Sequence, residues 1–354
     1  MKARLSSLIL VLVICVSLDA AILTVDNNNP SAGQYASIQA AVTAASNDDI
    51  IYVYPSLIPY QAFNLNKRLK IYGTGWRSDG VNIRGTSISG DVQLQGGSDN
   101  SLISGFGGFF NIKYSNNNNI HIDECCLSYF GTFNGSTSDT SHGMLITGTY
   151  FSGQIGTSPY IINSEGNGIS IYNCVFNQGI TSARRIIDKA SANITVVNSI
   201  LRSGTERVFV YANSSNGIPN LRNNYIEAAG YSTSGENTSL FPSSPTIMYN
   251  IGSGNIFPGG YNNLNNLSIN SVYNYSNNGS WTAIDGSPAI DAGDPDPEYN
   301  DVDGTRNDIG AYGGPYPINT RGSTTLPSIM EMSGTLYTSP SQGLQIHIEA
   351  SSRR

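Results

Sequence analysis

An alternating pattern of apolar and polar residues recurs in the middle of the chain every 24 or 25 residues. In each copy the first and third positions are mostly apolar, which is the spacing of a β-strand rather than of a helix. The copies in register are residues 120–127, 144–151, 169–176, 194–201 and 219–226. A short, fixed period indicates stacked units that are each too small to bury a core alone. The pattern therefore predicts an all-β fold, a parallel solenoid with one copy in each coil.

The register also predicts where side chains point. The third positions should form one interior column, made of Ile122, Ile146, Ile171 and Val196. The fifth position is asparagine in three successive copies, at residues 173, 198 and 223. Asparagine tolerates left-handed backbone, so we expect a sharp corner there, with side-chain amides bonded from coil to coil.

The cysteines test this register. Cys125 and Cys174 share the sixth position but lie two coils apart, with Thr149 between them. Coils stack about 4.8 Å apart, so the two cysteines should be about 9.6 Å apart, whereas a disulfide needs Cα atoms within about 7 Å. We expect both to be free and buried, and Cys126 to point outward.

The N-terminus is typical of an exported protein. Lys2 and Arg4 precede an apolar run over residues 8–16, and Ala20 offers a small residue for cleavage. Residues 1–20 are therefore predicted to be a signal peptide. A membrane anchor is the alternative, but the run is short of the roughly 20 residues that a spanning helix needs.

The segment after the predicted leader should close one end of the solenoid. Residues 21–49 contain a strand pattern at 22–26 and then Ser37, a good helix N-cap. Apolar residues follow at positions 38, 41, 42 and 45, which is the spacing of one helix face. We expect a short capping helix that covers the unpaired edge of the first coil. The turn 47–49, which holds Asp48 and Asp49, ends the helix.

The rest of the chain divides by composition. Residues 50–286 should form the coils, with longer loops after residue 227, where the period fades. Residues 287–314 change to proline- and aspartate-rich turns, and we expect them to form a C-terminal cap. Residues 315–354 hold two weak strand patterns and are predicted to be a tail or part of a further β module.

Charge narrows the class of partner. The chain has a net charge of −7, and the predicted leader carries +1, so the mature chain carries −8. An acidic chain with 12% charged residues does not fit a nucleic-acid binder. We expect a secreted or cell-surface monomer with no membrane span once the leader is removed.

Two pairs of segments resemble a known family. Residues 36–41 with 49–55 resemble the start of right-handed parallel β-helix proteins of the pectin-lyase-like superfamily. Residues 287–293 with 303–312 are similar to the C-terminal end of bacterial surface β-helix proteins of the "choice-of-anchor" group. The resemblance implies a right-handed, single-stranded parallel β-helix, export and association with polysaccharides. It implies no particular activity, because this architecture hosts many.

One cluster could support catalysis. Aligning residues 185–187 with 207–209 places Arg185 and Arg207 in the same phase one coil apart, with Lys189 opposite Tyr211. Cations beside a base could bind a uronate and remove its C5 proton, which is the chemistry of a polysaccharide lyase. The alternative is a solvated strand edge with surface ion pairs.

Two further sets of residues could bind ligands. The outward side of the repeat strand offers mixed polar and aromatic side chains suited to sugars, and the candidate binding residues are His121, Asp123, Tyr172, Arg222 and Tyr211. No cofactor is required, but calcium is a candidate, with ligands Asp294, Asp296, Asp301 and Asp303. The alternative for these aspartates is a turn built by side-chain hydrogen bonds.

The sequence therefore leaves three hypotheses. The first is an exported β-helix protein that binds a polysaccharide or cell-surface glycan without catalysis. The second is a uronate lyase that acts by β-elimination. The third is a structural or adhesive surface rod.

Overall fold

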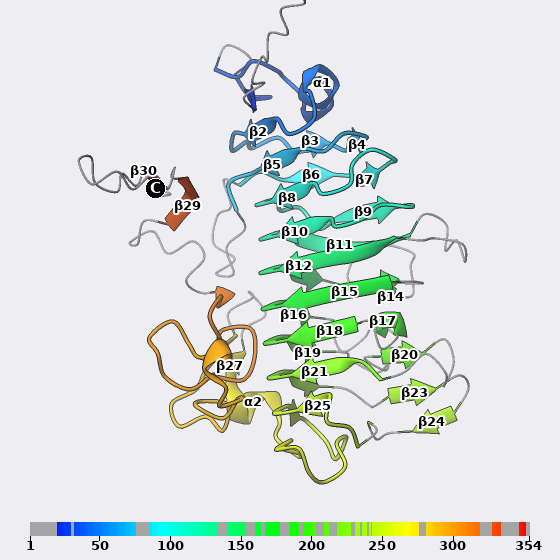
Figure 1. Cartoon of the computed structure of the whole chain (residues 1–354), viewed down its shortest axis with the longest axis vertical. Coiled ribbons are helices and arrows are strands. Elements are labelled where there is room, and N and C mark those ends of the chain that lie inside the picture. The colour runs from blue at the N-terminus through cyan, green and yellow to red at the C-terminus, as the bar shows by residue number, and fades with distance from the viewer. Residues whose placement is uncertain are drawn as a thin grey trace, which may run out of the picture.

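The fold was analysed in a computed structural model. It describes residues 20–29, 32–75, 85–132, 141–152, 160–163, 167–177, 185–190, 194–202, 209–211, 218–227, 231–233, 236–238, 241, 243–275, 281–318, 328–333 and 347–351. The architecture is all-β, with two long parallel sheets and few helices, as expected for a parallel solenoid (Figure 1).

The first sheet has ten strands, and all of its neighbouring strands pair in parallel. In spatial order they are β1 (Ile22–Val25), β2 (Ile50–Val53), β5 (Lys70–Tyr72), β8 (Leu102–Ser104), β10 (His121–Asp123), β12 (His142–Thr147), β15 (Asn167–Tyr172), β18 (Ile194–Val197), β21 (Asn220–Arg222) and β25 (Ile247–Met248). Figure 1 shows them stacked along the long axis of the molecule.

The interior column predicted from the repeat is confirmed. Ile122 pairs with Ile146, Ile146 with Ile171, and Ile171 with Val196, and all four side chains are fully buried. The column continues through six further buried residues, namely Leu23, Ile51, Ile71, Ile103, Leu221 and Ile247.

The second sheet has fourteen strands and carries the other wall of the core. They are β4 (Asn64–Leu65), β7 (Asp91–Leu94), β9 (Phe110–Tyr114), β11 (Cys126–Thr132), β13 (Tyr150–Ser152), β14 (Tyr160–Asn163), β16 (Val175–Asn177), β17 (Arg185–Ala190), β19 (Ile200–Arg202), β20 (Phe209–Tyr211), β22 (Tyr225–Glu227), β23 (Tyr231–Thr233), β24 (Glu236–Thr238) and β26 (Ile251–Gly252). Its inward side chains stack from rung to rung, as Phe151 does on Phe176 with ring centroids 4.5 Å apart.

Smaller pairs complete the described strands. β3 (Tyr60–Gln61) pairs with β6 (Ile88–Ser89) in parallel. Two separate pairs are antiparallel, β27 (Tyr273–Tyr275) with β28 (Trp281–Ala283) and β29 (Ser328–Ser333) with β30 (His347–Ser351), as are β23 and β24 at the end of the second sheet. The described helices are α1 (Ile38–Ala44), α2 (Ile269–Val272) and the 3-10 turn η2 (Pro297–Tyr299).

The predicted N-terminal helix is confirmed as α1. Ser37 is its N-cap, and its hydroxyl accepts a hydrogen bond from Ala40 N. The predicted apolar face at residues 38, 41, 42 and 45 is buried. Figure 1 shows α1 at the end of the stack that begins with β1 and β2.

Lys67 closes the other end of α1. Its ammonium donates to the carbonyls of Val42, Thr43 and Ala45 at 2.9, 2.8 and 2.6 Å. These carbonyls belong to the last turn, where the helix itself leaves acceptors unpaired and where the dipole favours a cation. We expect Lys67→Met to lower the free energy of unfolding by about 1–2 kcal/mol, measured by chemical denaturation.

The neighbouring residue supplies the control for that substitution. Arg68 pairs with Asp48, but both side chains are about half exposed. Arg68→Met should therefore cost less than about 0.5 kcal/mol. Equal losses for the two substitutions would contradict the capping role of Lys67.

The corner predicted at the fifth position is confirmed, but its amides make a different set of contacts. Asn173, Asn198 and Asn223 have φ angles of 52°, 48° and 57°. Asn223 Nδ2 donates to Asn198 Oδ1 at 3.4 Å, as a ladder requires. The other bonds run to a distant segment of the chain: Asn173 Nδ2 donates to Gly313 O at 2.8 Å, and Asn198 Nδ2 donates to Asp308 O at 3.1 Å.

The three cysteine predictions are confirmed, but the burial of Cys126 was not part of them. Cys125 and Cys174 are free and fully buried, as expected. Cys126 does leave the central core, but it is buried as well, with 7% of its surface exposed. Burial raises the pKa of the Cys125 and Cys126 thiols, so both should be inert.

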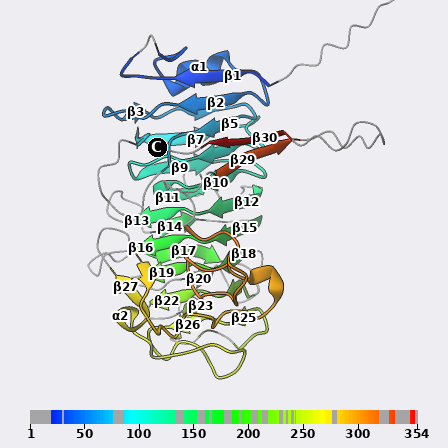
Figure 2. The same ribbon diagram turned by 90° about the vertical axis from the view of Figure 1, so that its left-hand side faces the viewer.

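Cys126 belongs to a buried apolar cluster on the outer face of the second sheet, which the C-terminal segment, residues 267–275 and 281–318, helps to cover. The covered residues form one column along six strands, made of Cys126, Tyr150, Val175, Ile200, Tyr225 and Ile251. Buried side chains of the segment pack on it, including Val272, Tyr273, Trp281 and Ile309. Figure 2 shows α2 and β27 beside β19 and β22. Residues 287–314 were expected to form a C-terminal cap, and in the structure they contact the outer face of the second sheet.

Candidate functional site

The outward face of the ten-stranded sheet brings together most of the predicted binding residues. Alternate residues of each strand point away from the core, so they form columns that run along the stack. One column joins six successive strands, and we call it the outward column: Tyr52, Tyr72, Ser104, Asp123, Thr147 and Tyr172. His121 lies beside it on β10.

The middle of the outward column is a hydrogen-bonded polar cluster. Asp123 accepts from Ser104 Oγ at 3.2 Å through one carboxylate oxygen and from Thr147 Oγ1 at 2.5 Å through the other. His121 Nε2 lies 2.9 Å from the same Thr147 oxygen. Because Thr147 donates its proton to Asp123, His121 must donate to Thr147. The cluster therefore places a carboxylate, two hydroxyls and an imidazole side by side on the outward face.

Aromatic rings lie on both sides of this cluster. Tyr52 and Tyr72 stack with ring centroids 5.5 Å apart and an interplanar angle of 25°. Tyr172 follows Thr147 on the next strand. All three rings are partly exposed. An aromatic ring offers an apolar face and, in tyrosine, a hydroxyl that can donate or accept.

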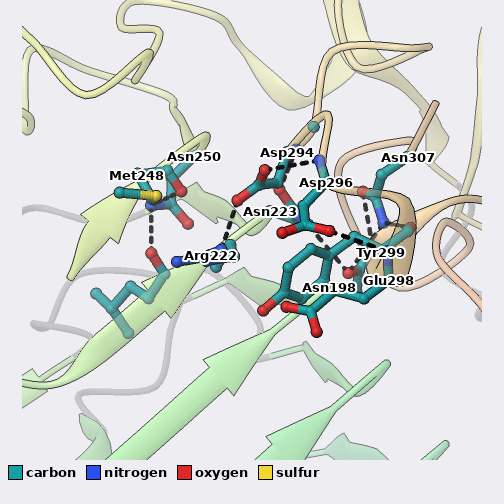
Figure 3. Close-up of polar contacts among 12 residues, drawn as sticks. Asn198, Arg222, Asn223, Met248, Asn250, Asp294, Asp296, Glu298, Tyr299 and Asn307 are labelled. Atoms are coloured by element: carbon teal, nitrogen blue, oxygen red, sulfur yellow. Dashed lines mark hydrogen bonds and ion pairs between the residues drawn. The ribbon is translucent and has the colours of Figure 1, made fainter. Parts of the chain in front are cut away.

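Two predicted binding residues are placed elsewhere. Arg222 continues the column two strands beyond Tyr172, but its guanidinium contacts residues of the C-terminal segment (Figure 3). It donates to Asp294 at 2.5 Å and lies 5.0 Å from the ring centroid of Tyr299. Tyr211 is on β20 of the other sheet, and its side chain lies outside the described residues.

The three predicted catalytic residues cannot be assembled into a site from the described part of the chain. Arg185 and Lys189 are on β17, but their side chains lie outside the described residues, as does Arg207 entirely. The backbone register corrects one detail: Ala190, not Lys189, pairs with Tyr211, because the strand shifts register after Asp188.

The four candidate calcium ligands each bind groups of their own chain. Asp294 pairs with Arg222, and Asp296 caps η2 by accepting from Glu298 N. Asp301 accepts from the amides of Asp308 and Gly314.

Asp303 accepts from the amide and hydroxyl of Thr305 at 3.0 and 2.6 Å. Such contacts are typical of turns built by aspartate side chains. Among the described residues, no group of three or more His, Cys, Asp or Glu side chains is placed to hold a metal ion.

Burial makes Asp301 sensitive to pH. Desolvation raises its pKa to about 6, from an ordinary value of 3.8, although two backbone amides oppose the shift. The folded protein therefore keeps a proton on Asp301 that the unfolded chain loses between about pH 4 and 6. The stabilisation from this group is complete below about pH 4 and is lost as the pH rises to 6.

We expect this loss to disappear in Asp301→Asn. Urea midpoints measured at pH 4, 5, 6 and 7 should fall more steeply with pH in the wild type than in the variant. Asp303→Asn is the control, because hydrogen bonds from Thr305 lower the pKa of the exposed Asp303 and should give the opposite trend. Parallel pH profiles for the wild type and Asp301→Asn would contradict the assignment.

Thr147 lies within the repeat but was not predicted as a site residue from the sequence. Nor were three earlier residues of the outward column: Tyr52, Tyr72 and Ser104. They precede the regular repeat, because the strands before β10 follow one another at irregular intervals. The alternating pattern of residues 69–72 was a usable signal, since it matches the repeat strand with Tyr72 in the outward phase.

Comparisons with known proteins do not assign the chain to a family. No protein-family model, curated protein or solved structure matches the chain. No helix in the described residues is long and apolar enough to cross a membrane.

Proposed function

We propose that the chain is an exported, right-handed, single-stranded parallel β-helix that binds a polysaccharide along the outward column. The parallel pairing of strands about one coil apart supports the β-helix. Crossover connections between parallel strands are right-handed in nearly all proteins, which supports the handedness.

The observation that carries the binding proposal is the order of side chains in the outward column. Tyrosines lie at both ends, and the Asp123 cluster lies between them. Rungs repeat about every 4.8 Å, so Tyr72 and Tyr172, four rungs apart, are about 19 Å from each other. An extended polymer could stack on both rings while its hydroxyls bond to Asp123 and Thr147, with the buried Ser104 holding Asp123 in place.

The charge of this face favours an uncharged glycan. From β2 to β15, Lys70 is the one lysine or arginine among the described outward side chains, and Asp123 is negative. Recognition of carboxylates generally uses arginine forks or clusters of cations. Arg222 cannot serve, because Asp294 already neutralises it. We therefore expect neutral polysaccharides to bind better than uronate polymers.

The test is binding of the purified protein to a panel of neutral and uronic-acid polysaccharides. Tyr72→Ala and Tyr172→Ala should each weaken binding about tenfold, since loss of one stacking platform costs on the order of 1.4 kcal/mol. Tyr261→Ala, at an exposed tyrosine in a loop, should change nothing. Binding of a neutral glycan should also be insensitive to salt.

Absence of binding across the panel would overturn the proposal and favour a structural rod. Tight, salt-sensitive binding to uronic-acid polymers alone would overturn the expectation of a neutral polysaccharide. It would leave the outward column as the proposed binding surface. Catalysis is not part of the proposal, because no clear catalytic motif accompanies the lyase candidates Arg185, Lys189 and Arg207 in the sequence.

A further inference from the structure

Asp49 is a buried carboxylate without a charged partner in the described part of the chain. It lies in the turn between α1 and β2, with 7% of its surface exposed. One oxygen accepts from Ser46 N at 2.7 Å and the other from Ala21 N at 2.8 Å. No described lysine, arginine or histidine forms an ion pair with it, whereas the neighbouring Asp48 has Arg68. A buried carboxylate is costly unless it is paired or fully hydrogen-bonded.

The position of Ala21 explains how Asp49 could gain a charge partner. Ala21 is the residue directly after Ala20, the small residue at the predicted end of the leader. Its backbone is held on both sides, because Ala21 O also accepts from Ile50 N at 2.9 Å. The nitrogen that contacts Asp49 is therefore the atom that cleavage after Ala20 would turn into the N-terminus.

We propose that a leader-cleaving protease hydrolyses the bond between Ala20 and Ala21, and that the new α-ammonium forms an ion pair with Asp49. Water adds across the peptide bond, so the leader departs with the Ala20 carboxylate and Ala21 gains an amino group. That group takes up a proton at neutral pH, because an α-amine has a pKa of about 7.7–8.0. An amide-to-carboxylate hydrogen bond becomes an ion pair at the same place.

The pair would tie β1 to the turn that precedes β2, at the end of the stack covered by α1. Processing would thereby stabilise the first rung only in the exported, cleaved chain. The inference depends on the expectation of export and not on glycan binding, so either can fail alone.

The first test identifies the N-terminus. The full chain is expressed with its leader in a secreting host, and the exported protein is analysed by intact mass and N-terminal sequencing. The expected first residue is Ala21. A mature chain that begins at any other residue would overturn the proposal.

The second test moves the ammonium without changing any charge. A chain that begins at Ala20 carries its ammonium one residue, about 3.8 Å, further along the backbone. Its unfolding equilibrium constant at pH 6 should be about fivefold larger than that of the chain that begins at Ala21. Asp49→Asn should abolish this difference, and Asp48→Asn should preserve it. Equal stabilities of the two wild-type chains would overturn the ion pair.

The pH dependence gives a readout that does not need Asp49→Asn to fold. Pairing with Asp49 should raise the pKa of the Ala21 amine above its ordinary range, so the added stability is present below about pH 8 and is lost at higher pH. An NMR titration of the α-amine in the chain that begins at Ala21 should give a pKa above 8. A value at or below the ordinary range would overturn the proposal.

Discussion

Ile171→Ala is expected to lower the free energy of unfolding by about 3–4 kcal/mol, because it removes buried methyl groups from the middle of the interior column. Ile171 is fully buried and pairs with Ile146 on one side and Val196 on the other. The rungs above and below hold the backbone in place, so the cavity cannot collapse easily. Chemical denaturation followed by circular dichroism measures the loss.

Ser170→Ala is the matched control for this prediction. Ser170 precedes Ile171 on the same strand but faces outward and is partly exposed. Its replacement should change the free energy of unfolding by less than about 0.5 kcal/mol. Ile171→Val should fall between the two, at about 1 kcal/mol. Similar losses at residues 170 and 171 would mean that the alternation of inward and outward positions is not what stabilises the stack.

The interior of this fold was predictable because its contacts follow the repeat. Residues one period apart become neighbours in a stack, so Ile122, Ile146, Ile171 and Val196 could be aligned by counting along the chain. The corner asparagines and the two free cysteines followed from the same count. Local rules were sufficient for α1, since a cap residue and one apolar face define a short helix.

The covering of the second sheet was not predicted, because it joins residues far apart in the chain. Asn173 and Gly313 are 140 residues apart, and no period relates them. The seventh position of the repeat did hold a signal: Tyr150, Val175, Ile200 and Tyr225 are apolar or aromatic although they face away from the core. An apolar outward column needs a covering layer, and this column also explains why Cys126 is buried.

The candidate face was predictable only in part, for a different reason. His121, Asp123 and Tyr172 lie within the repeat, so their outward direction could be derived. Tyr52, Tyr72 and Ser104 lie in strands separated by loops of variable length, and only the strand pairing aligns them. The sequence also gave no sign that Asp294 would neutralise Arg222, since the two are 72 residues apart.

Asn198→Ala is expected to lower the free energy of unfolding by about 3–4 kcal/mol and to release the C-terminal segment from the stack. Asn198 is 2% exposed, and its amide donates to Asp308 O at 3.1 Å and to Asn307 Oδ1 at 3.1 Å. Asn307 Nδ2 returns a bond to Asn198 Oδ1 at 3.2 Å. Alanine would leave these buried groups unpaired, at about 1–3 kcal/mol, and would occupy left-handed backbone, at about 1–2 kcal/mol.

A glycine at the same position separates the two contributions. Asn198→Gly loses the same hydrogen bonds but accepts φ = 48° without strain, so it should be about 1 kcal/mol less destabilising than alanine. Both variants should expose Trp281, a fully buried residue of the segment itself, and shift its fluorescence to longer wavelength. Glu124→Ala is the control, because Glu124 has the same corner conformation, with φ = 46°. Its corner comes earlier in the stack than the three asparagine corners that contact the segment, at residues 173, 198 and 223. If Asn198→Ala unfolds like Glu124→Ala and leaves the fluorescence unchanged, the corner asparagines do not hold the C-terminal segment in place.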